Sequence, residues 1–324
     1  MSYLRVLTAT CLIAGAVTAC QRPMPAADDH MAHMAAGDLS MPATSNPANL
    51  QGHSGLPPSA VTAAARLAAS PRHGEWVKIA WEPGSADSLM AWIVYPSTTR
   101  AKTPVVVVVH EIFGLQTWVR GVADQVAADG FIAIAPDLLS RVRGGASTEE
   151  LPAQEATKLI QGVNAAERVK GITAAANYAM SQPSAEQKFG TIGFCWGGQT
   201  QWMYATNGGI KGYSGSVAFY GLPYMSGAVP NKDSLAKVKV PMMLLSGAKD
   251  ARIGAGMPGV DSAMTADNKS YYGENYGGAV HGFMRAQDDP KATRDEAEEQ
   301  ANLAAAKDAW PRTISFLKKN LGMN

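Results

Sequence analysis

The chain has 324 residues, of which 46% are hydrophobic and 17% charged, enough apolar material for the core of one large domain. Its 28 Lys and Arg residues against 27 Asp and Glu residues leave a formal net charge of +1. Nucleic-acid-binding proteins usually show a basic excess or a basic stripe, so this balance argues against a nucleic-acid partner.

The first 19 residues are typical of an export signal. Arg5 supplies a positive start, and Val6 to Val17 is mostly apolar but too short to cross a bilayer. The segment ends in Val17-Thr18-Ala19-Cys20, which resembles the lipobox of bacterial lipoproteins and implies cleavage before Cys20 and lipidation of its thiol. Gln21 then favours the outer membrane. We expect an exported protein, lipid-anchored on the periplasmic side, with a plain secretory signal as the alternative.

Residues 20–74 are predicted to form a flexible tether. From residue 21 to about residue 75 the chain has no Phe, Trp or Tyr and is rich in small and polar residues, so it can bury little apolar surface. Residues 59–69 could form one short helix. A solvated linker is the favoured reading, although the tether also holds four residues of types that bind copper, namely His30, Met31, His33 and Met34.

The catalytic domain is expected over residues 75–322, where predicted strands alternate with predicted helices. The strands are expected over 75–81, 89–95, 105–109, 131–135, 189–194, 216–220, 241–245 and 270–276. The helices are expected over 117–128, over 149–180 with a break near Gly162, after Trp196, and over 294–321. This alternation predicts an α/β protein with a mostly parallel sheet covered by helices on both faces, and an antiparallel hairpin at one edge.

The strongest chemical signal is Gly193-Phe194-Cys195-Trp196-Gly197, which follows a predicted strand and opens a helix. It is the G-x-C-x-G form of the nucleophile elbow, with cysteine in the serine position. Cys11 would leave with the signal and Cys20 would carry lipid, so Cys195 has no disulfide partner. A helix N-terminus at the thiol favours the thiolate. The alternative is a buried structural cysteine in a glycine-rich turn.

A base and an acid follow the cysteine in the chain. His281 comes after the last predicted strand, and Asp250 lies in the loop after strand 241–245. The order Cys195, Asp250, His281 is the nucleophile–acid–base order of the α/β-hydrolase fold, and we expect that fold. His281 could instead be a surface loop histidine. One oxyanion donor is expected to be the backbone N–H of Trp196, and the second an N–H of the loop after strand 105–109.

Three motifs together resemble the dienelactone hydrolase family (carboxymethylenebutenolidases) over about residues 75–320. They are His110-Glu111-Ile112-Phe113-Gly114-Leu115, Gly193-Phe194-Cys195-Trp196-Gly197-Gly198 and His281-Gly282-Phe283. The resemblance implies that Glu111 holds the cysteine as a neutral thiol until substrate arrives, and that Ile112 supplies the second oxyanion donor.

The same resemblance implies three substrate-binding residues. Arg141 and Arg285 would bind a substrate carboxylate, for which the planar fork of arginine is suited, and Tyr220 matches a site tyrosine. Each arginine could instead form a weak surface ion pair, and the tyrosine could be a core aromatic.

We therefore expect a monomeric hydrolase, without metal or cofactor, that opens a lactone or a carboxylate-bearing ester through a thioester on Cys195. A broad carboxylesterase or thioesterase on the same machinery is the nearest alternative. A non-catalytic envelope binding protein on the same fold is another, and a redox role for Cys195 is weaker because no resolving cysteine is present.

Overall fold

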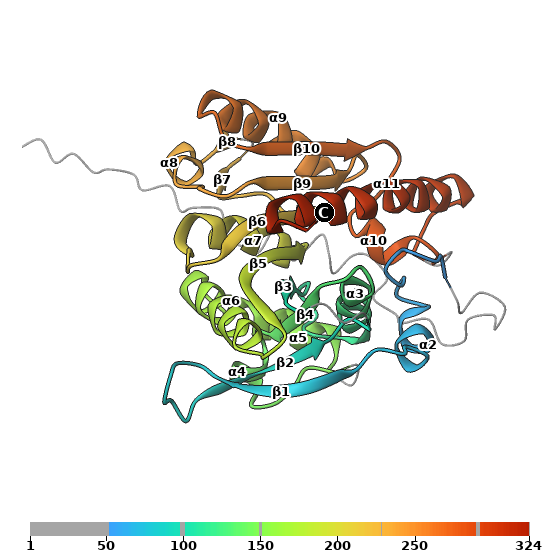
Figure 1. Ribbon diagram of the computed structural model, residues 1–324. Coiled ribbons are helices and arrows are strands. Elements are labelled where there is room, and N and C mark those ends of the chain that lie inside the picture. The colour runs from blue at the N-terminus through green and yellow to red at the C-terminus, as the bar shows by residue number, and fades with distance from the viewer. Residues whose placement is uncertain (1–51, 98–100, 149–150, 228, 290–291, 324) are drawn as a thin grey trace, which may run out of the picture. The chain divides into compact units, whose positions relative to one another are not determined.

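The computed structural model describes residues 52–97, 101–148, 151–227, 229–289 and 292–323 (Figure 1). The expected signal peptide, the expected lipidation site Cys20 and the His/Met group of the tether lie outside the described residues. Among the helices of the described residues, none is both long and apolar enough to span a membrane.

An eight-stranded sheet runs through the domain in the order β1-β2-β4-β3-β5-β6-β9-β10. The two pairs at the β1 edge, β1/β2 and β2/β4, are antiparallel, and all other pairs are parallel. The strands are β1 (Gly74–Ala80), β2 (Ser88–Val94), β3 (Thr103–Val109), β4 (Ile132–Asp137), β5 (Ala185–Phe194), β6 (Tyr213–Phe219), β9 (Met242–Gly247) and β10 (Tyr271–Tyr276). Every predicted strand is confirmed, as is the edge hairpin. A separate short pair consists of β7 (Met225–Ser226) and β8 (Val229–Pro230).

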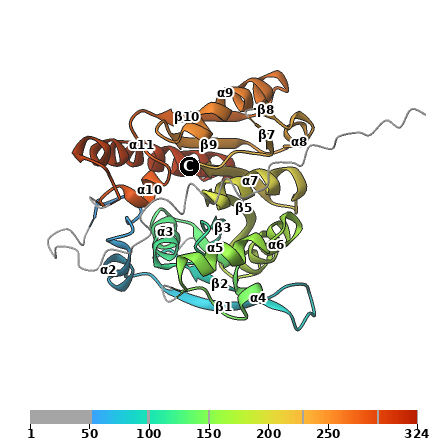
Figure 2. The same ribbon diagram turned by 180° about the vertical axis from the view of Figure 1, so that it is seen from behind.

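Helices cover both faces of the sheet, as predicted. Helices α3 (Thr117–Ala128) and α11 (Glu296–Leu321) lie on one face, and α6 (Ala165–Met180) and α7 (Trp196–Asn207) lie on the other (Figures 1 and 2). The shorter helices are α2 (Ala63–Ala68), α4 (Ser140–Arg143), α5 (Ala153–Gln161), α8 (Lys232–Ala236) and α10 (Phe283–Ala286). The expected break near Gly162 separates α5 from α6, whose first turn is closed by a capping box between Asn164 and Glu167.

Helix α9 (Ala251–Ala266) is not anticipated by the sequence pattern. It contains three glycines and Pro258, all poor helix formers. Its buried side chains, among them Ile253, Met257 and Val260, pack in one apolar cluster with Leu244 of β9. Tertiary burial therefore stabilises a helix that local propensity does not favour.

Residues 53–69, the N-terminal strap, pack against the catalytic domain, in contrast to the expected flexible tether. Leu56 is buried, the Trp118 Nε1–H donates to the Pro58 carbonyl (2.9 Å), and the Ala60 N–H donates to the Arg285 carbonyl (2.9 Å). The segment needs no aromatic residue of its own because the domain supplies Trp118. The expected boundary at residue 75 is thus too late: residues 52–74 belong to the folded domain, and α2 is the short helix anticipated within them.

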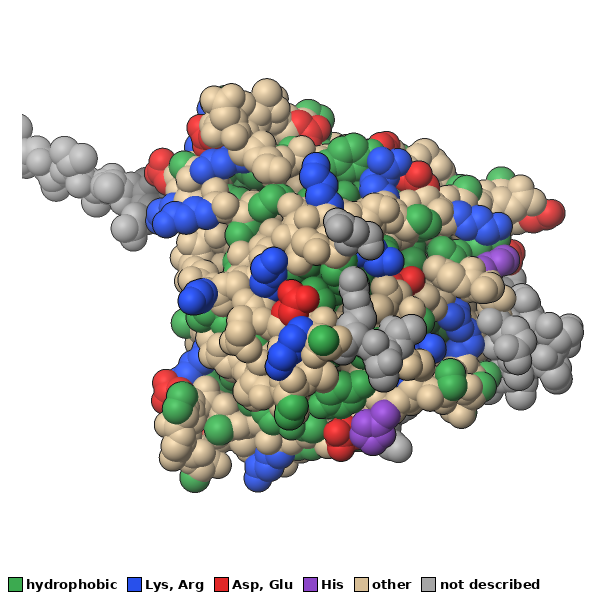
Figure 3. Space-filling view, viewed as in Figure 1, with side chains coloured by type: hydrophobic (Ala, Val, Ile, Leu, Met, Phe, Trp, Pro, Cys, Tyr) green, Lys and Arg blue, Asp and Glu red, His purple; other side chains and the backbone are tan. Residues whose placement is uncertain are grey.

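The surface carries charges of both signs. On the face shown in Figure 3, Lys and Arg side chains are interspersed with Asp and Glu side chains instead of gathering in one patch. Such a mixture gives that face no strong field of one sign.

Candidate active site

Cys195 stands on a strained turn between β5 and α7. Its backbone has φ 56° and ψ −114°, outside the regions that a non-glycine residue ordinarily adopts. The turn is held by a hydrogen bond from the Cys195 N–H to the Phe219 carbonyl (3.0 Å). A Cβ on Gly193 would lie 2.2 Å from the Gly197 carbonyl oxygen, and a Cβ on Gly197 would lie 2.5 Å from the His110 carbonyl oxygen. Glycine is therefore required on both sides of the thiol, as the motif predicts.

Asp250 and His281 meet from two different loops. Asp250 is the N-cap of α9, where its Oδ1 accepts the Ile253 N–H (3.1 Å) and its Oδ2 is hydrogen-bonded to Nδ1 of His281. The other ring nitrogen of His281, Nε2, is buried and makes no hydrogen bond among the described residues. The Asp250 carboxylate thus holds one nitrogen of the imidazole, and the other nitrogen is available for proton transfer.

The pKa of His281 responds to both Cys195 and Asp250. Burial lowers the pKa of His281, but its interactions with Cys195, together with those with Asp250, raise it to about 10. Burial raises the pKa of Asp250, yet the hydrogen bond to His281 and its charge hold that pKa below the ordinary value. Sulfur, imidazole and carboxylate therefore interact as one group, which includes all three residues expected from their order in the chain.

Glu111, Arg285 and Tyr220 form a second interacting group beside His281. Glu111 is buried in the loop after β3, and its Oε2 forms an ion pair with Nε of Arg285 on α10 (3.2 Å). The Tyr220 hydroxyl is buried without a hydrogen-bond partner among the described residues. Burial raises the pKa of Tyr220 well above its ordinary value, and the charges of Glu111 and Cys195 raise it further, while Arg285 lowers it. The tyrosine ring also lies 4.9 Å from that of His281, centroid to centroid.

His110 holds the loop that contains Glu111 and Ile112. Its Nδ1 is hydrogen-bonded to the Glu111 carbonyl (2.6 Å), and its Nε2 accepts the Leu138 N–H (3.0 Å), which assigns a neutral ring with the proton on Nδ1. Burial lowers the pKa of His110, in keeping with a neutral ring. Both nitrogens are occupied, so His110 is a structural hydrogen-bonding residue and not a second base.

The two residues expected to form the oxyanion hole come from the elbow and from the loop after β3. Trp196 is the first residue of α7, where backbone N–H groups have no partner within the helix. Its ring is stacked on that of His110, with centroids 5.6 Å apart and planes within 8°. Ile112 is buried in the loop held by His110. The stacking ties this loop to the elbow.

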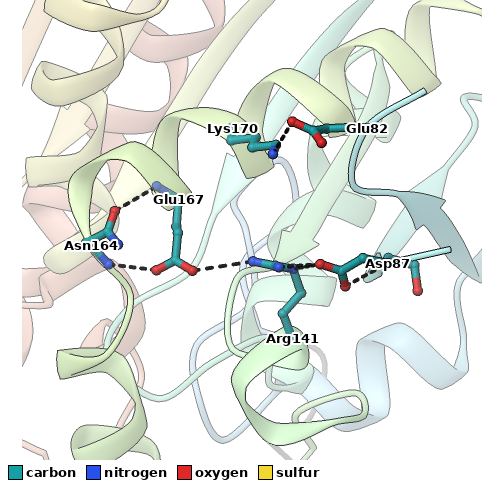
Figure 4. Close-up of polar contacts among 7 residues, drawn as sticks. Glu82, Asp87, Arg141, Asn164, Glu167 and Lys170 are labelled. Atoms are coloured by element: carbon teal, nitrogen blue, oxygen red, sulfur yellow. Dashed lines mark hydrogen bonds and ion pairs between the residues drawn. The ribbon is translucent and has the colours of Figure 1, made fainter. Parts of the chain in front are cut away.

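Arg141, in contrast, is not brought together with these residues. Its guanidinium forms ion pairs with Asp87 and, at 3.4 Å, with Glu167 (Figure 4). Its Cζ lies 3.9 Å from the centre of the Trp81 ring. Two carboxylates of the protein thus already neutralise it. Its assignment as a ligand for a substrate carboxylate stays a prediction that these contacts do not favour.

Arg168 is a site candidate that the sequence reasoning missed. It lies in the first turn of α6, and its Cζ is 4.1 Å from the centre of the Trp196 ring. Arg168 belongs to none of the three motifs, and its burial depends on the packing of α6 against α7. Its only signal in the sequence is its position near the start of the helix that precedes the elbow strand.

The parallel sheet, the strained elbow and the residues gathered at its cysteine define an α/β-hydrolase. The model of the "Dienelactone hydrolase family" matches residues 89–321. The chain belongs to this family, and it is a carboxylic ester hydrolase of that type.

Individual relatives agree with this assignment. An Escherichia coli (strain K12) protein named "Putative carboxymethylenebutenolidase" is 25% identical over 272 residues, covering 82% of this chain and 95% of the relative. The carboxymethylenebutenolidase of Pseudomonas putida is 29% identical over 157 residues, covering 48% of this chain and 64% of the relative. A crystal structure titled "Putative Dienelactone Hydrolase" from Klebsiella pneumoniae has a TM-score of 0.62 and 26% identity, and the match covers 76% of this chain and 99% of that one.

Proposed function

We propose that the protein hydrolyses a lactone or a carboxylate-bearing ester through a thioester on Cys195. The observation that carries this proposal is the state of His281: its Nδ1 is bound by Asp250, while its buried Nε2 has no hydrogen bond among the described residues and interacts with Cys195. An imidazole oriented in this way can take a proton from a nucleophile and return it to a leaving group.

The first half of the reaction forms the thioester. Neutral His281 takes the thiol proton at Nε2 as the Cys195 sulfur attacks the carbonyl carbon. The N–H groups of Ile112 and Trp196 stabilise the resulting oxyanion, an effect worth about 2.7–4 kcal/mol per donor. The carbon–oxygen bond of the ester or lactone then breaks, and protonated His281 donates its Nε2 proton to the leaving oxygen. In a lactone the leaving oxygen stays attached, so the ring opens on the enzyme.

The second half releases the acid. Neutral His281 accepts a proton from water at Nε2, the hydroxide attacks the thioester carbonyl, and the Cys195 thiolate leaves. Asp250 stabilises the imidazolium that forms in each half. No metal or cofactor enters these steps.

Glu111 has its role in the enzyme before substrate binds. Its carboxylate is proposed to hold Cys195 as a neutral thiol until substrate displaces the carboxylate. Displacement would break the ion pair of Glu111 with Arg285 and release a guanidinium beside the reacting carbonyl. Arg285 would then be available to a substrate carboxylate, and Tyr220 would line the same space.

Export and anchoring form a separate part of the proposal. The apolar stretch to Val17 and the lipobox-like residues before Cys20 support a lipoprotein on the periplasmic side of the outer membrane. Mass spectrometry of the N-terminal peptide tests it: we expect a diacylglyceryl group on Cys20 and membrane association that is lost in Cys20→Ala. An unmodified peptide starting elsewhere would refute the anchor.

One observation favours the broader alternative. Arg141 is neutralised by Asp87 and Glu167, which weakens the case for an obligatory substrate carboxylate at that position. A carboxylesterase or thioesterase of wide specificity would hydrolyse neutral esters as well as acidic ones.

The decisive experiment compares wild type with Cys195→Ala on cis- and trans-dienelactone and on p-nitrophenyl esters. We expect turnover with the wild type, none with Cys195→Ala, and a covalent acyl adduct on Cys195 in rapidly quenched mass spectra. Unchanged far-ultraviolet circular dichroism is the control for folding. Full activity of Cys195→Ala would contradict the thioester mechanism.

A further inference from the structure

Arg168 is a half-buried cation that no carboxylate of the described residues neutralises. Its Nε–H donates to the Val163 carbonyl (3.1 Å), and Nη1 reaches Gln199 Oε1 (3.4 Å) and Thr200 Oγ1 (3.5 Å), all of them uncharged groups. Within the described ranges, Nη2 donates no hydrogen bond, so two of the five N–H donors of the guanidinium have no protein acceptor.

Arg168 differs from Arg141 in its charged partners. Both side chains stack on a tryptophan, Arg141 on Trp81 and Arg168 on Trp196. Arg141 has two carboxylate partners, whereas burial lowers the pKa of Arg168 to about 10 and only the nearby Tyr224 hydroxyl opposes that shift. Nη2 of Arg168 is not among the buried atoms that lack a hydrogen-bond partner, so this edge of the guanidinium faces solvent and an anion from outside the protein can reach it.

The position of Arg168 in the fold would place such an anion near Cys195. Helix α6 leads into β5, and β5 ends at Cys195, so the first turn of α6 lies at the carboxyl edge of the sheet, where ligands bind in such folds. Trp196, beneath the guanidinium, directly follows the nucleophile and provides one of the two proposed oxyanion donors. An anion held by Arg168 would therefore lie on the α6 side of the reacting carbonyl.

We propose that Arg168 is a specificity-determining residue, and that its Nη2 edge binds a carboxylate of the ester or lactone substrate. The proposal rests on the proposed function and refines it, because it moves the preference for an acidic substrate from Arg141 to a residue outside the family motifs. A guanidinium pairs bidentately with a planar carboxylate, and its stacking on Trp196 fixes the orientation of that fork.

The test uses two matched substrates, mono-p-nitrophenyl glutarate and its uncharged glutaramate analogue, and measures the ratio of their kcat/KM values. We expect Arg168→Gln to lower the ratio of the kcat/KM values for acidic and neutral substrate about 10- to 100-fold, the range expected for loss of a charge-assisted hydrogen bond. Arg168→Lys keeps the charge without the fork and should give an intermediate ratio. Arg141→Gln is the matched control and should leave the ratio unchanged.

The outcomes separate this inference from the proposed function. A ratio within twofold of wild type in Arg168→Gln would overturn the role of Arg168, as would a collapse of the ratio in Arg141→Gln alone. If Arg168→Gln does not fold, the same ratio of kcat/KM values is measured for Arg168→Lys. A lowered ratio supports the proposal, and an unchanged ratio overturns it. A wild-type enzyme that hydrolyses neither substrate nor a dienelactone would instead refute the proposed function.

Discussion

The substitution Asp250→Asn separates the orientation of the catalytic histidine from the stability of the fold. In the structure Oδ1 of Asp250 caps α9 by accepting the Ile253 N–H (3.1 Å), and Oδ2 is bonded to Nδ1 of His281. Asparagine can keep the first bond, since it is also a good N-cap residue. Its amide N–H group would replace the second oxygen and oppose the Nδ1–H of the ring, so the imidazole would take the tautomer with its proton on Nε2.

A proton on Nε2 prevents the ring from accepting one from the Cys195 thiol or from water. General base catalysis contributes about 10²–10⁴-fold, so kcat/KM for a p-nitrophenyl ester should fall by about that factor, equivalent to about 2.7–5.5 kcal/mol of transition-state stabilisation. The assay is steady-state hydrolysis near neutral pH, together with the rate at which iodoacetamide alkylates Cys195. Both rates should fall.

A matched control is available in Asp295→Asn. Asp295 caps α11 in the same way, with its Oδ1 accepting the Glu298 N–H (2.8 Å), and no histidine is bonded to it among the described residues. This variant should keep wild-type activity. An Asp250→Asn enzyme within threefold of wild type, or an equal loss in Asp295→Asn, would refute the reasoning.

Two further predictions concern the charge on His281 and the N-terminal strap. Cys195→Ala should lower the pKa of His281 from about 10, because the interaction with Cys195 is one of those that raise it. A raised folded-state pKa stabilises the protein fully below the ordinary value of 6.5, and this contribution is lost as pH rises through about 10. In the variant the contribution should be smaller and its loss should be complete at a lower pH. Ring nitrogen NMR titration and urea unfolding against pH measure the two effects, and an unmoved titration would contradict the assignment. Trp118→Phe should lower the free energy of unfolding by about 1–3 kcal/mol, because it leaves the buried Pro58 carbonyl without its donor. The control is Trp92→Phe, since the Trp92 Nε1 has no hydrogen-bond partner among the described residues. If urea denaturation showed the same loss of unfolding free energy in both variants, the stabilising role of the bond from Trp118 to the strap would be contradicted.

The sheet and the elbow were predictable because their signals are local. The five valines from Val105 to Val109 describe a strand buried on both faces, and all of them are fully buried in the structure. The glycines around Cys195 are required by backbone approaches within a single turn. Such constraints act over a few residues and are therefore visible in the sequence without knowledge of the fold.

The strap and α9 were not predictable in the same way, because their stability depends on distant partners. The strap has no aromatic residue, and it is held by Trp118 and by the backbone of Arg285, both far away in the chain. Helix α9 has weak propensity and is held by apolar contacts with β9. Composition alone therefore favoured a solvated segment in one case and left a helix unassigned in the other.

The arginines show the same limit at the level of function. The family resemblance selects Arg141 as a substrate-binding residue, but whether a guanidinium binds substrate depends on which anions the fold places beside it. The hairpin loop after β1 brings Asp87 to Arg141, and α6 adds Glu167, whereas Arg168, one residue further along the same helix, turns toward Trp196 and meets neither carboxylate. Glu167 and Arg168 are neighbours on one helix, yet Glu167 neutralises Arg141 while Arg168 has no carboxylate partner among the described residues. Only the folded structure reveals this difference.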